Sequence, residues 1–367
     1  MHRSIFISMK RKIDSLQTLR FLACLSIFVH HCYLAQYIEY SGVSVFFVMS
    51  GFLMYCNYID REPMSLSPLA CTRFSIKKIS RLYPLHVLTM LPILALDIYV
   101  GHDAAYLVTE TVANLLLVQT WLTDYAQSLN GVAWYLSVSL FLYFAFPYIL
   151  HLVKRLKSRS SAFIAIAVLI LCQALFAFTG APVSIHFFGC VDEAYTNWYG
   201  YTLPITRCFD FAAGCVLGRI FLTRKDGECE GRTASLLLEI FAAALSVGAI
   251  LLYRRFTTVP YVRTLTSAVF FLPASCVLVY LFAVGKGLIP RLLTNRVTVF
   301  LGNVSAAFFL IHQDVIRISY IFLDRMGLSS EQCKPIFFFG CGAISIGLSY
   351  LYNCIDRRIR DKKRLSA

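Results

Sequence analysis

Apolar runs of sixteen to twenty residues recur from one end of this 367-residue chain to the other. A run of that length, folded as an α-helix, spans the roughly 30 Å hydrocarbon core of a bilayer. The hydrophobic fraction is 58% and the charged fraction 15%, whereas about a quarter of a soluble domain is charged. The sequence therefore predicts an all-α fold, a polytopic membrane helix bundle rather than several soluble domains.

We expect about ten transmembrane helices, near residues 19–38, 42–59, 82–100, 134–153, 161–179, 204–222, 235–253, 265–284, 297–322 and 335–354. The stretch 106–122 is also apolar. A full crossing there would place the basic cluster 154–159 outside, so we interpret it as a re-entrant or half-span segment. The chain then divides into a cytoplasmic N-terminal segment (1–12), an integral membrane domain (13–354) and a basic cytoplasmic tail (355–367).

The net charge of +14 raises the question of nucleic-acid binding. With ten spans, however, 27 of the 34 Lys and Arg residues fall on one side of the membrane, as the positive-inside rule describes. We therefore expect no nucleic-acid partner and an integral protein of a bacterial cytoplasmic (inner) membrane, with both termini cytoplasmic. The first apolar run lacks a small-residue cleavage site, so it is expected to remain as an anchor.

The thirteen cysteines are scattered singly, without a Cys-x-x-Cys pair. This pattern indicates neither a metal site nor a disulfide framework, so no metal is expected. Cys190 and Cys333 fall in loops placed outside, which leaves one bridge between them open.

The first span carries ionisable side chains that are expensive in a membrane and are usually functional there. Arg20 and His31 are eleven residues apart, so they share a helix face and lie about 16 Å apart along the axis. The neighbouring His30 is rotated away by roughly 80°. Two further spans contain opposite charges three residues apart, which suggests the ion pairs Arg207–Asp210 and Asp314–Arg317.

Six short motifs occur along residues 13–354 in an order that resembles the membrane-bound acyltransferase-3 family, whose members O-acylate cell-surface glycans. The matching residues are Arg20 and His31 (Arg, ten residues, His); Gly42, Val43, Phe46, Phe47, Ser50, Gly51 and Phe52; Lys78, Arg81 and Pro84; Asn130, Trp134, Leu136 and Ser137; Arg207, Phe211, Gly214 and Gly218; and Leu301, Gly302, Ser305 and His312.

The resemblance implies a site on these residues. His31 would be the catalytic base, because acyl transfer needs a base to take the hydroxyl proton, and Arg20 would be the second catalytic residue. The implied donor is acetyl-CoA, whose phosphates would be held by Arg20, Arg73, Lys78 and Arg81. The implied acceptor site consists of Trp134, Asn130, His312 and Arg207. Alternatively, the cations only anchor the protein by the positive-inside rule, and Trp134 belongs to an interfacial tryptophan belt. His312 is either a second acid/base or a structural partner.

Two departures from the family pattern matter. Ser44 and Ser139 stand where members often carry Asp and Glu, so two carboxylates that could orient or charge a histidine are lost, and the partner of His31 is left open. The resemblance is to the membrane domain without the C-terminal hydrolase-like SGNH domain that many members carry, so we expect the bundle to act alone or with a separate protein.

The predicted function is a membrane O-acyltransferase that moves acetyl from acetyl-CoA to a sugar hydroxyl of a surface polysaccharide, lipopolysaccharide or lipid-linked glycan. Its partners would be membrane lipids, the glycan acceptor and glycan-assembly proteins. A polytopic transporter or flippase for a glycan or lipid precursor is the main alternative, because buried charges in many spans also suit transport. A structural subunit of a glycan-assembly complex is a third. The lack of repeated hydropathy halves and the order of the motifs favour the enzyme.

Overall fold

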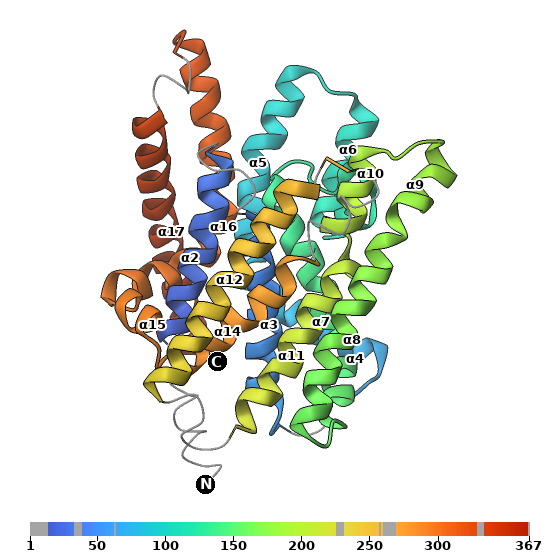
Figure 1. The fold of residues 1–367 in the computed structure, drawn as a ribbon. Coiled ribbons are helices and arrows are strands. Elements are labelled where there is room, and N and C mark those ends of the chain that lie inside the picture. Colours follow the sequence, from blue (N-terminus) through green and yellow to red (C-terminus); the bar gives the residue numbers. More distant parts are fainter. Residues whose placement is uncertain are drawn as a thin grey trace.

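The computed structural model describes residues 14–32, 39–61, 64–224, 231–256, 258–259, 269–328 and 334–365. Within these ranges the regular secondary structure is helical (Figure 1). The longer helices are α2 (Asp14–His31), α3 (Glu39–Tyr58), α5 (Tyr83–Val100), α7 (Trp134–Lys154), α8 (Arg159–Phe178), α11 (Pro204–Leu222), α12 (Arg232–Phe256), α14 (Phe271–Val284), α16 (Arg296–Arg325) and α17 (Lys334–Leu365). The shorter elements are α4 (Pro68–Ile79), α6 (Ala104–Leu115), α9 (Gly180–Phe188), α10 (Glu193–Asn197), α15 (Leu288–Leu293), three 3₁₀ turns (Gln119–Trp121, Thr123–Tyr125 and Gly131–Ala133) and a π-helical turn (Trp198–Thr202).

The prediction of an all-α membrane bundle is confirmed, since a helix occupies each of the ten expected spans. Seven of the described helical segments are long and apolar enough to cross a membrane, and α14 is a shorter apolar helix. The two remaining spans, α2 and α11, carry more polar side chains. Gln17 and Thr18 on α2, and Arg207 and Asp210 on α11, are buried inside the protein. Their polarity is therefore directed at neighbouring helices rather than at lipid.

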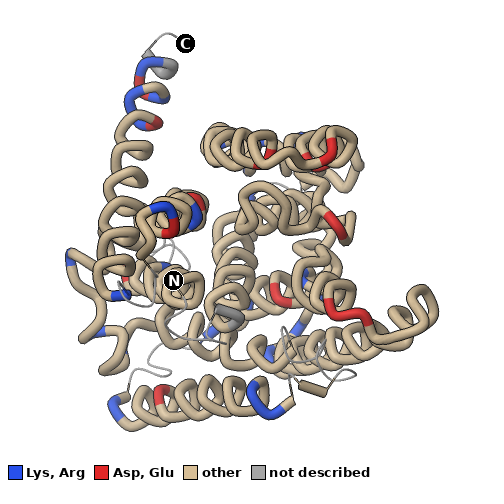
Figure 2. The backbone as a smooth tube through the Cα atoms, turned by 90° about the horizontal axis from the view of Figure 1, so that it is seen from above, with Lys and Arg blue, Asp and Glu red and all other residues tan. Residues whose placement is uncertain are grey.

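The bundle has central and peripheral helices. In the apolar windows of α3 and α16, 67% of the residues are buried, whereas in α8, α12 and α17 the share is 17–22%. The side chains exposed on the outer helices are large and apolar, such as Leu171 on α8 and Leu237 on α12. A lipid environment satisfies such surfaces, so the arrangement fits an integral membrane protein. Figure 2 shows α17 leading its charged C-terminal turns away from the rest of the bundle.

The first and ninth spans run parallel and in register. Thr18 lies 3.1 Å from Thr298, Cys24 donates to the carbonyl of Ser305 at 3.7 Å, and His31 lies 2.8 Å from His312. Seven long helices separate α2 from α16. Because each crossing reverses the direction of the chain, an odd number of intervening crossings makes α16 parallel to α2. An additional full crossing between them would have made the two antiparallel.

The stretch 106–122, for which we expected a half-span segment, is the piece that could have added that crossing. It forms α6 followed by 3₁₀ turns. A helix of twelve residues is about 18 Å long, well short of a roughly 30 Å hydrocarbon core. The structure therefore agrees with a segment that enters the bundle without crossing it. Cys333, one half of the disulfide considered above, lies outside the described residues, as does the segment 1–12.

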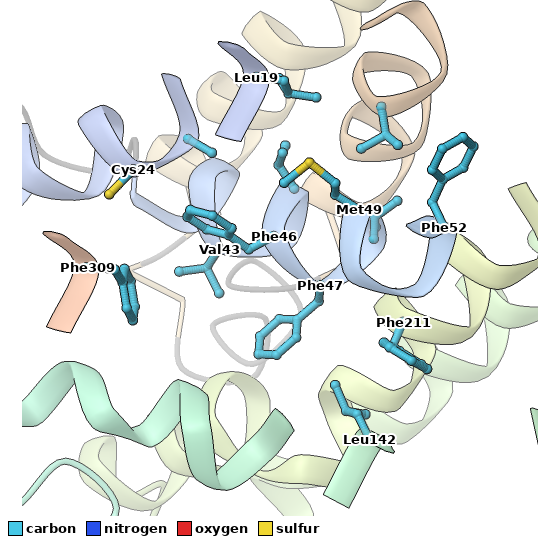
Figure 3. Close-up of a cluster of buried hydrophobic side chains, with 14 of the residues drawn as sticks. Leu19, Cys24, Val43, Phe46, Phe47, Met49, Phe52, Leu142, Phe211 and Phe309 are labelled. Carbon is cyan, nitrogen blue, oxygen red and sulfur yellow. The ribbon is translucent and has the colours of Figure 1, made fainter. Parts of the chain in front are cut away.

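The core centres on α3, which packs most closely against α11 (Figure 3). A β-carbon at Gly51 would meet the backbone carbonyl of Phe211, and one at Gly214 would meet that of Val48. Small residues let the two backbones approach, as is common in membrane helices. Gly51 is thus a packing residue. Phe47, Phe52 and Phe211 fill the space around this contact and are fully buried.

Candidate functional site

A cavity of about 320 Å³ opens near the start of α2, and three cations line it: Arg20, Lys78 and Arg81. We call it the Arg20 cavity. Its other lining residues are Phe46, Met49, Ser50, Leu53, Met54, Asn57, Leu82, Tyr135, Leu136, Tyr143, Ala306 and Phe309. None of the lining residues that the structure describes is acidic. A positive cavity with an apolar wall is suited to a ligand that has an anionic head and a less polar arm.

The three cations are not equally free. Arg20 is half-buried and donates to Gln17 at 3.3 Å, along its own helix. Lys78 places its ammonium 4.5 Å from the centroid of the Tyr58 ring. Arg81 is 60% exposed and lies 3.8 Å from Asp356 on α17, which marks the outer mouth of the cavity. The arginine of this pair faces solvent, where ion pairs contribute little, so Arg81 can exchange Asp356 for another anion at small cost.

A second cavity, of about 170 Å³, lies where α2 ends and is lined by His31. We call it the His31 cavity. Its wall is drawn from seven helical elements and one loop, and it consists of Ile27, His30, His31, Val43, Gln127, Gly131, Val132, Trp134, Asn197, Tyr201, Phe309 and Gln313. Phe309 is shared with the Arg20 cavity. The two cavities are therefore neighbours within the bundle, with an aromatic side chain between them.

His31 has a definite partner, His312 on α16. Its Nδ1 lies 2.8 Å from Nε2 of His312, and Nδ1 of His312 lies 3.1 Å from the carbonyl of Phe308. A carbonyl only accepts, so the Nδ1 of His312 carries the proton and its Nε2 is the acceptor. In the neutral pair, His31 must then donate from Nδ1 and keep its lone pair on Nε2. The partner of His31 is thus a second imidazole, and Ser44 donates to Asp210.

His30 does not face away from this site, so the expectation from ideal helix rotation was wrong. Its ring centroid lies 5.5 Å from that of His31, and both residues line the His31 cavity. They also line a larger cavity of about 620 Å³ with Tyr99, Arg317 and Arg325. An imidazole at the end of a helix is long enough to swing across the rotation between adjacent positions. The site thus has two histidines on its wall and a wide approach from the α5–α16 side.

The segment before α7 is tied to α16 beside His312. Asn130 is buried, and its amide donates to the carbonyl of Leu310 at 2.8 Å. The backbone amide of Val132 donates to the Gln313 side chain at 2.7 Å, and a β-carbon at Gly131 would press on that same side chain. These contacts fix where α7 begins. They place Trp134, which is 4% exposed, in the wall of the His31 cavity.

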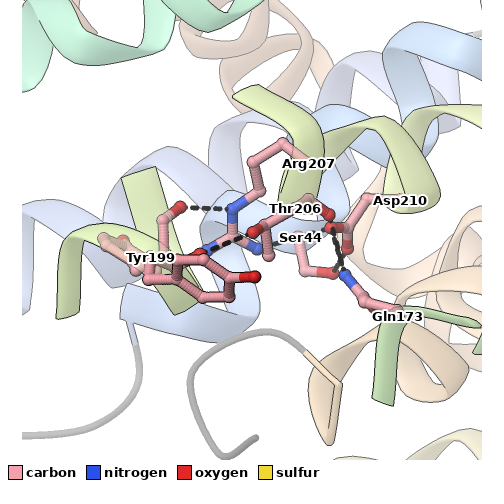
Figure 4. Close-up of polar contacts among 7 residues, drawn as sticks. Ser44, Gln173, Tyr199, Thr206, Arg207 and Asp210 are labelled. Carbon is pink, nitrogen blue, oxygen red and sulfur yellow. Dashed lines mark hydrogen bonds and ion pairs between the residues drawn. The ribbon is translucent and has the colours of Figure 1, made fainter. Parts of the chain in front are cut away.

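Arg207 lies behind that wall, fully buried. It donates to the carbonyl of Tyr201 at 2.7 Å and pairs with Asp210 at 3.4 Å, as the spacing predicted (Figure 4). Asp210 also accepts from Gln173 of α8 at 3.0 Å. The Arg207 guanidinium lies 4.6 Å from the Tyr201 ring. The network joins α3, α8 and α11 and supports Tyr201, which lines the His31 cavity. Arg207 therefore holds the wall of the cavity in place and is not itself a lining residue.

Comparisons with known proteins show the family of this chain. Residues 13–354 match an acyltransferase domain, that of the acyltransferase-3 family, which is more than nine-tenths of the chain. The chain belongs to the acyltransferase-3 family. It is also 27% identical over 333 residues to acyltransferase MdmB of Streptomyces mycarofaciens, with 83% of this chain and 79% of that protein covered. No solved structure matches the chain.

The structure brings together most of the site residues inferred for this acyltransferase from its sequence. Arg20, Lys78 and Arg81 share one cavity, and His31 and Trp134 share the next. His312 contacts His31 directly, whereas Asn130 and Arg207 hold the surrounding elements in place. Arg73 is exposed on α4 and is not among the residues that line the Arg20 cavity. The second pair considered above also differs, because Arg317 contacts Asp97 of α5 at 3.1 Å instead of Asp314.

Several residues of the acyltransferase site were not inferred from the sequence. Tyr135 and Gln313 directly follow the motif residues Trp134 and His312, so sequence adjacency was a usable signal. Phe309 and Tyr201 gave no such signal, because an aromatic residue in an apolar run looks like any other core residue. Their importance comes only from their position beside the cavities.

Proposed function

We propose that this acyltransferase transfers an acetyl group from acetyl-CoA to a sugar hydroxyl of a surface polysaccharide, lipopolysaccharide or lipid-linked glycan. One observation carries the proposal: a cationic cavity and a hydrogen-bonded histidine pair meet at a shared aromatic wall. Acyl transfer needs both parts, since the donor must be held by its charged portion while a base activates the acceptor.

The Arg20 cavity suits the donor. Phosphates bind arginine and lysine through charge-assisted hydrogen bonds, and Arg20, Lys78 and Arg81 line the cavity without an acidic neighbour among its lining residues. Met49, Leu53 and Met54 provide an apolar wall beside these cations, which suits a less polar arm. We therefore propose that the phosphates of the donor lie at the Arg81 mouth and that its thioester lies toward Phe309.

His31 then acts as the base. The hydrogen bond to His312 keeps the lone pair on its Nε2, which accepts the proton of the acceptor hydroxyl. The hydroxyl oxygen forms a bond to the thioester carbonyl carbon, the carbon–sulfur bond breaks, and the departing thiolate takes the proton from the imidazolium. His312 holds the ring of His31 in place throughout, so it serves as a positioning residue.

The reaction can be tested in membranes that contain or lack the protein, using [¹⁴C]acetyl-CoA as donor. We expect label to enter glycan or glycolipid only where the protein is present, and mass spectrometry of the surface glycan should then differ by one acetyl group. Movement of a labelled glycan lipid across the bilayer without any acetyl transfer would instead identify a transporter and refute the proposal.

The proposed orientation makes a separate prediction. The proposal places the Arg20 cavity at the cytoplasmic face, where acetyl-CoA is made. The C-terminal end of α7, at Lys154, would lie at that same face, so the loop between α7 and α8 should be cytoplasmic as well. A cysteine introduced at Lys157, after replacement of the native cysteines, should resist an impermeant maleimide in intact cells and react after permeabilisation. A cysteine at exposed His102, beyond the other end of α5, is the matched control and should react in intact cells. The opposite labelling pattern would invert the proposed orientation.

A further inference from the structure

The wall between the two cavities is a cluster of three aromatic rings from three helices. The centroid of the Phe309 ring on α16 lies 5.9 Å from that of Phe46 on α3 and 5.4 Å from that of Tyr135 on α7. Phe46 and Tyr135 are themselves 5.9 Å apart, so each ring contacts the other two. All three line the Arg20 cavity, and Phe309 also lines the His31 cavity. We call these residues the aromatic septum.

The septum lies directly against the histidine pair. The Phe309 ring centroid is 5.9 Å from that of His312, whose Nε2 is bonded to His31. Phe309 is 5% exposed and Phe46 is 9% exposed, so the rings are packed rather than loosely arranged. A group that moves from the Arg20 cavity to the base must pass these rings or rest against them.

We propose that the aromatic septum, and Phe309 in particular, is the gate that determines how long an acyl group the enzyme can transfer. The inference rests on the proposed function, because it assumes that the thioester approaches from the Arg20 cavity. In a thioester the acyl chain extends beyond the carbonyl, away from the sulfur. A donor that approaches from the Arg20 cavity therefore presents its acyl chain first, and this chain meets the septum rings as the carbonyl comes toward the hydroxyl bound at His31.

The packing sets a preference for short chains. An acetyl group adds one methyl to the carbonyl, whereas a butyryl group adds two further methylenes that must displace a buried ring. One methylene in a tight pocket commonly changes the specificity constant by about 10- to 200-fold. Tyr135, like Arg20, lines the Arg20 cavity. The septum therefore forms the wall at which the polar part of that cavity ends.

The experiment compares butyryl-CoA with acetyl-CoA as the labelled donor, using membranes that contain the full-length protein and its glycan acceptor. In the Phe309→Ala variant we expect the ratio of butyryl to acetyl transfer to rise at least tenfold over the wild-type ratio. Phe309→Leu, which keeps an apolar side chain of intermediate size, should raise it less and is the deciding variant if the alanine variant inserts poorly. A ratio within twofold of wild type in an inserted variant would refute the gate.

Phe338→Ala is the matched control. Phe338 is a partly buried phenylalanine on α17 that packs on Phe28 at 5.1 Å and lines an apolar groove between α2, α16 and α17. Its truncation removes a ring of the same size from outside the two cavities, so the chain-length ratio should stay at the wild-type value. An equal rise in this control would show that the change in ratio comes from general loosening and would count against the gate. Failure of the wild type to transfer from any acyl-CoA would instead refute the proposed function.

Discussion

Replacement of His31 with Ala is expected to lower acyl transfer by about 10²- to 10⁴-fold, which is the range that general-base catalysis contributes. The physical reason is that His31 lines the second cavity and, through its bond to His312, keeps a lone pair on Nε2 for the acceptor proton. The measurement is the rate of label transfer from [¹⁴C]acetyl-CoA to the glycan at matched amounts of inserted protein.

Two other histidines serve as comparisons. His151→Ala, on the exposed end of α7, should leave the rate unchanged. His30→Ala should retain substantial activity, although His30 also lines the cavity, because the pair with His312 is made by His31. His312→Leu should give a partial loss, since His31 would remain but would no longer be held in one tautomer. An active His31→Ala variant together with an inactive His30→Ala variant would contradict the assignment of the base.

Replacement of Arg20 or Lys78 with Gln is expected to weaken acetyl-CoA binding by roughly tenfold to a hundredfold for each side chain. A hydrogen bond to a charged group is worth about 1.5–3 kcal/mol, and every 1.4 kcal/mol is tenfold in affinity. Both cations line the Arg20 cavity, and no acid among its described lining residues offsets them. The dissociation constant can be measured by calorimetry with the protein in lipid nanodiscs.

The adjacent lysine on α4 gives a sharp control for this experiment. Lys77 is exposed and is not a lining residue, whereas Lys78 is half-buried and borders the cavity. Lys77→Gln should therefore leave the affinity unchanged, and Arg73→Gln should do the same because Arg73 is exposed on the same helix. If Lys77→Gln weakened binding as much as Lys78→Gln, the effect would be one of general surface charge and the proposed phosphate site would be wrong.

The sequence alone determined the class of fold. Apolar runs long enough to cross a bilayer can only become helices there, because each backbone amide must bond within its own segment. Local length, charge and spacing predicted the positions of the ten spans. They also predicted that 106–122 does not cross the membrane and that Arg207 pairs with Asp210. The family resemblance also identified His31 and the cations of the Arg20 cavity, since motif residues recur in order along the chain.

What the tertiary structure decided are the relations between residues far apart in the chain. His31 and His312 are 281 positions apart and meet only because α2 and α16 run parallel and in register. The same packing brings Phe46, Tyr135 and Phe309 together and gives Arg317 an acid on α5 instead of its neighbour on α16. Local sequence patterns specify helices and the faces they bury. The register between helices, and with it the septum and the partner of the base, depends on which side chains interlock across the bundle.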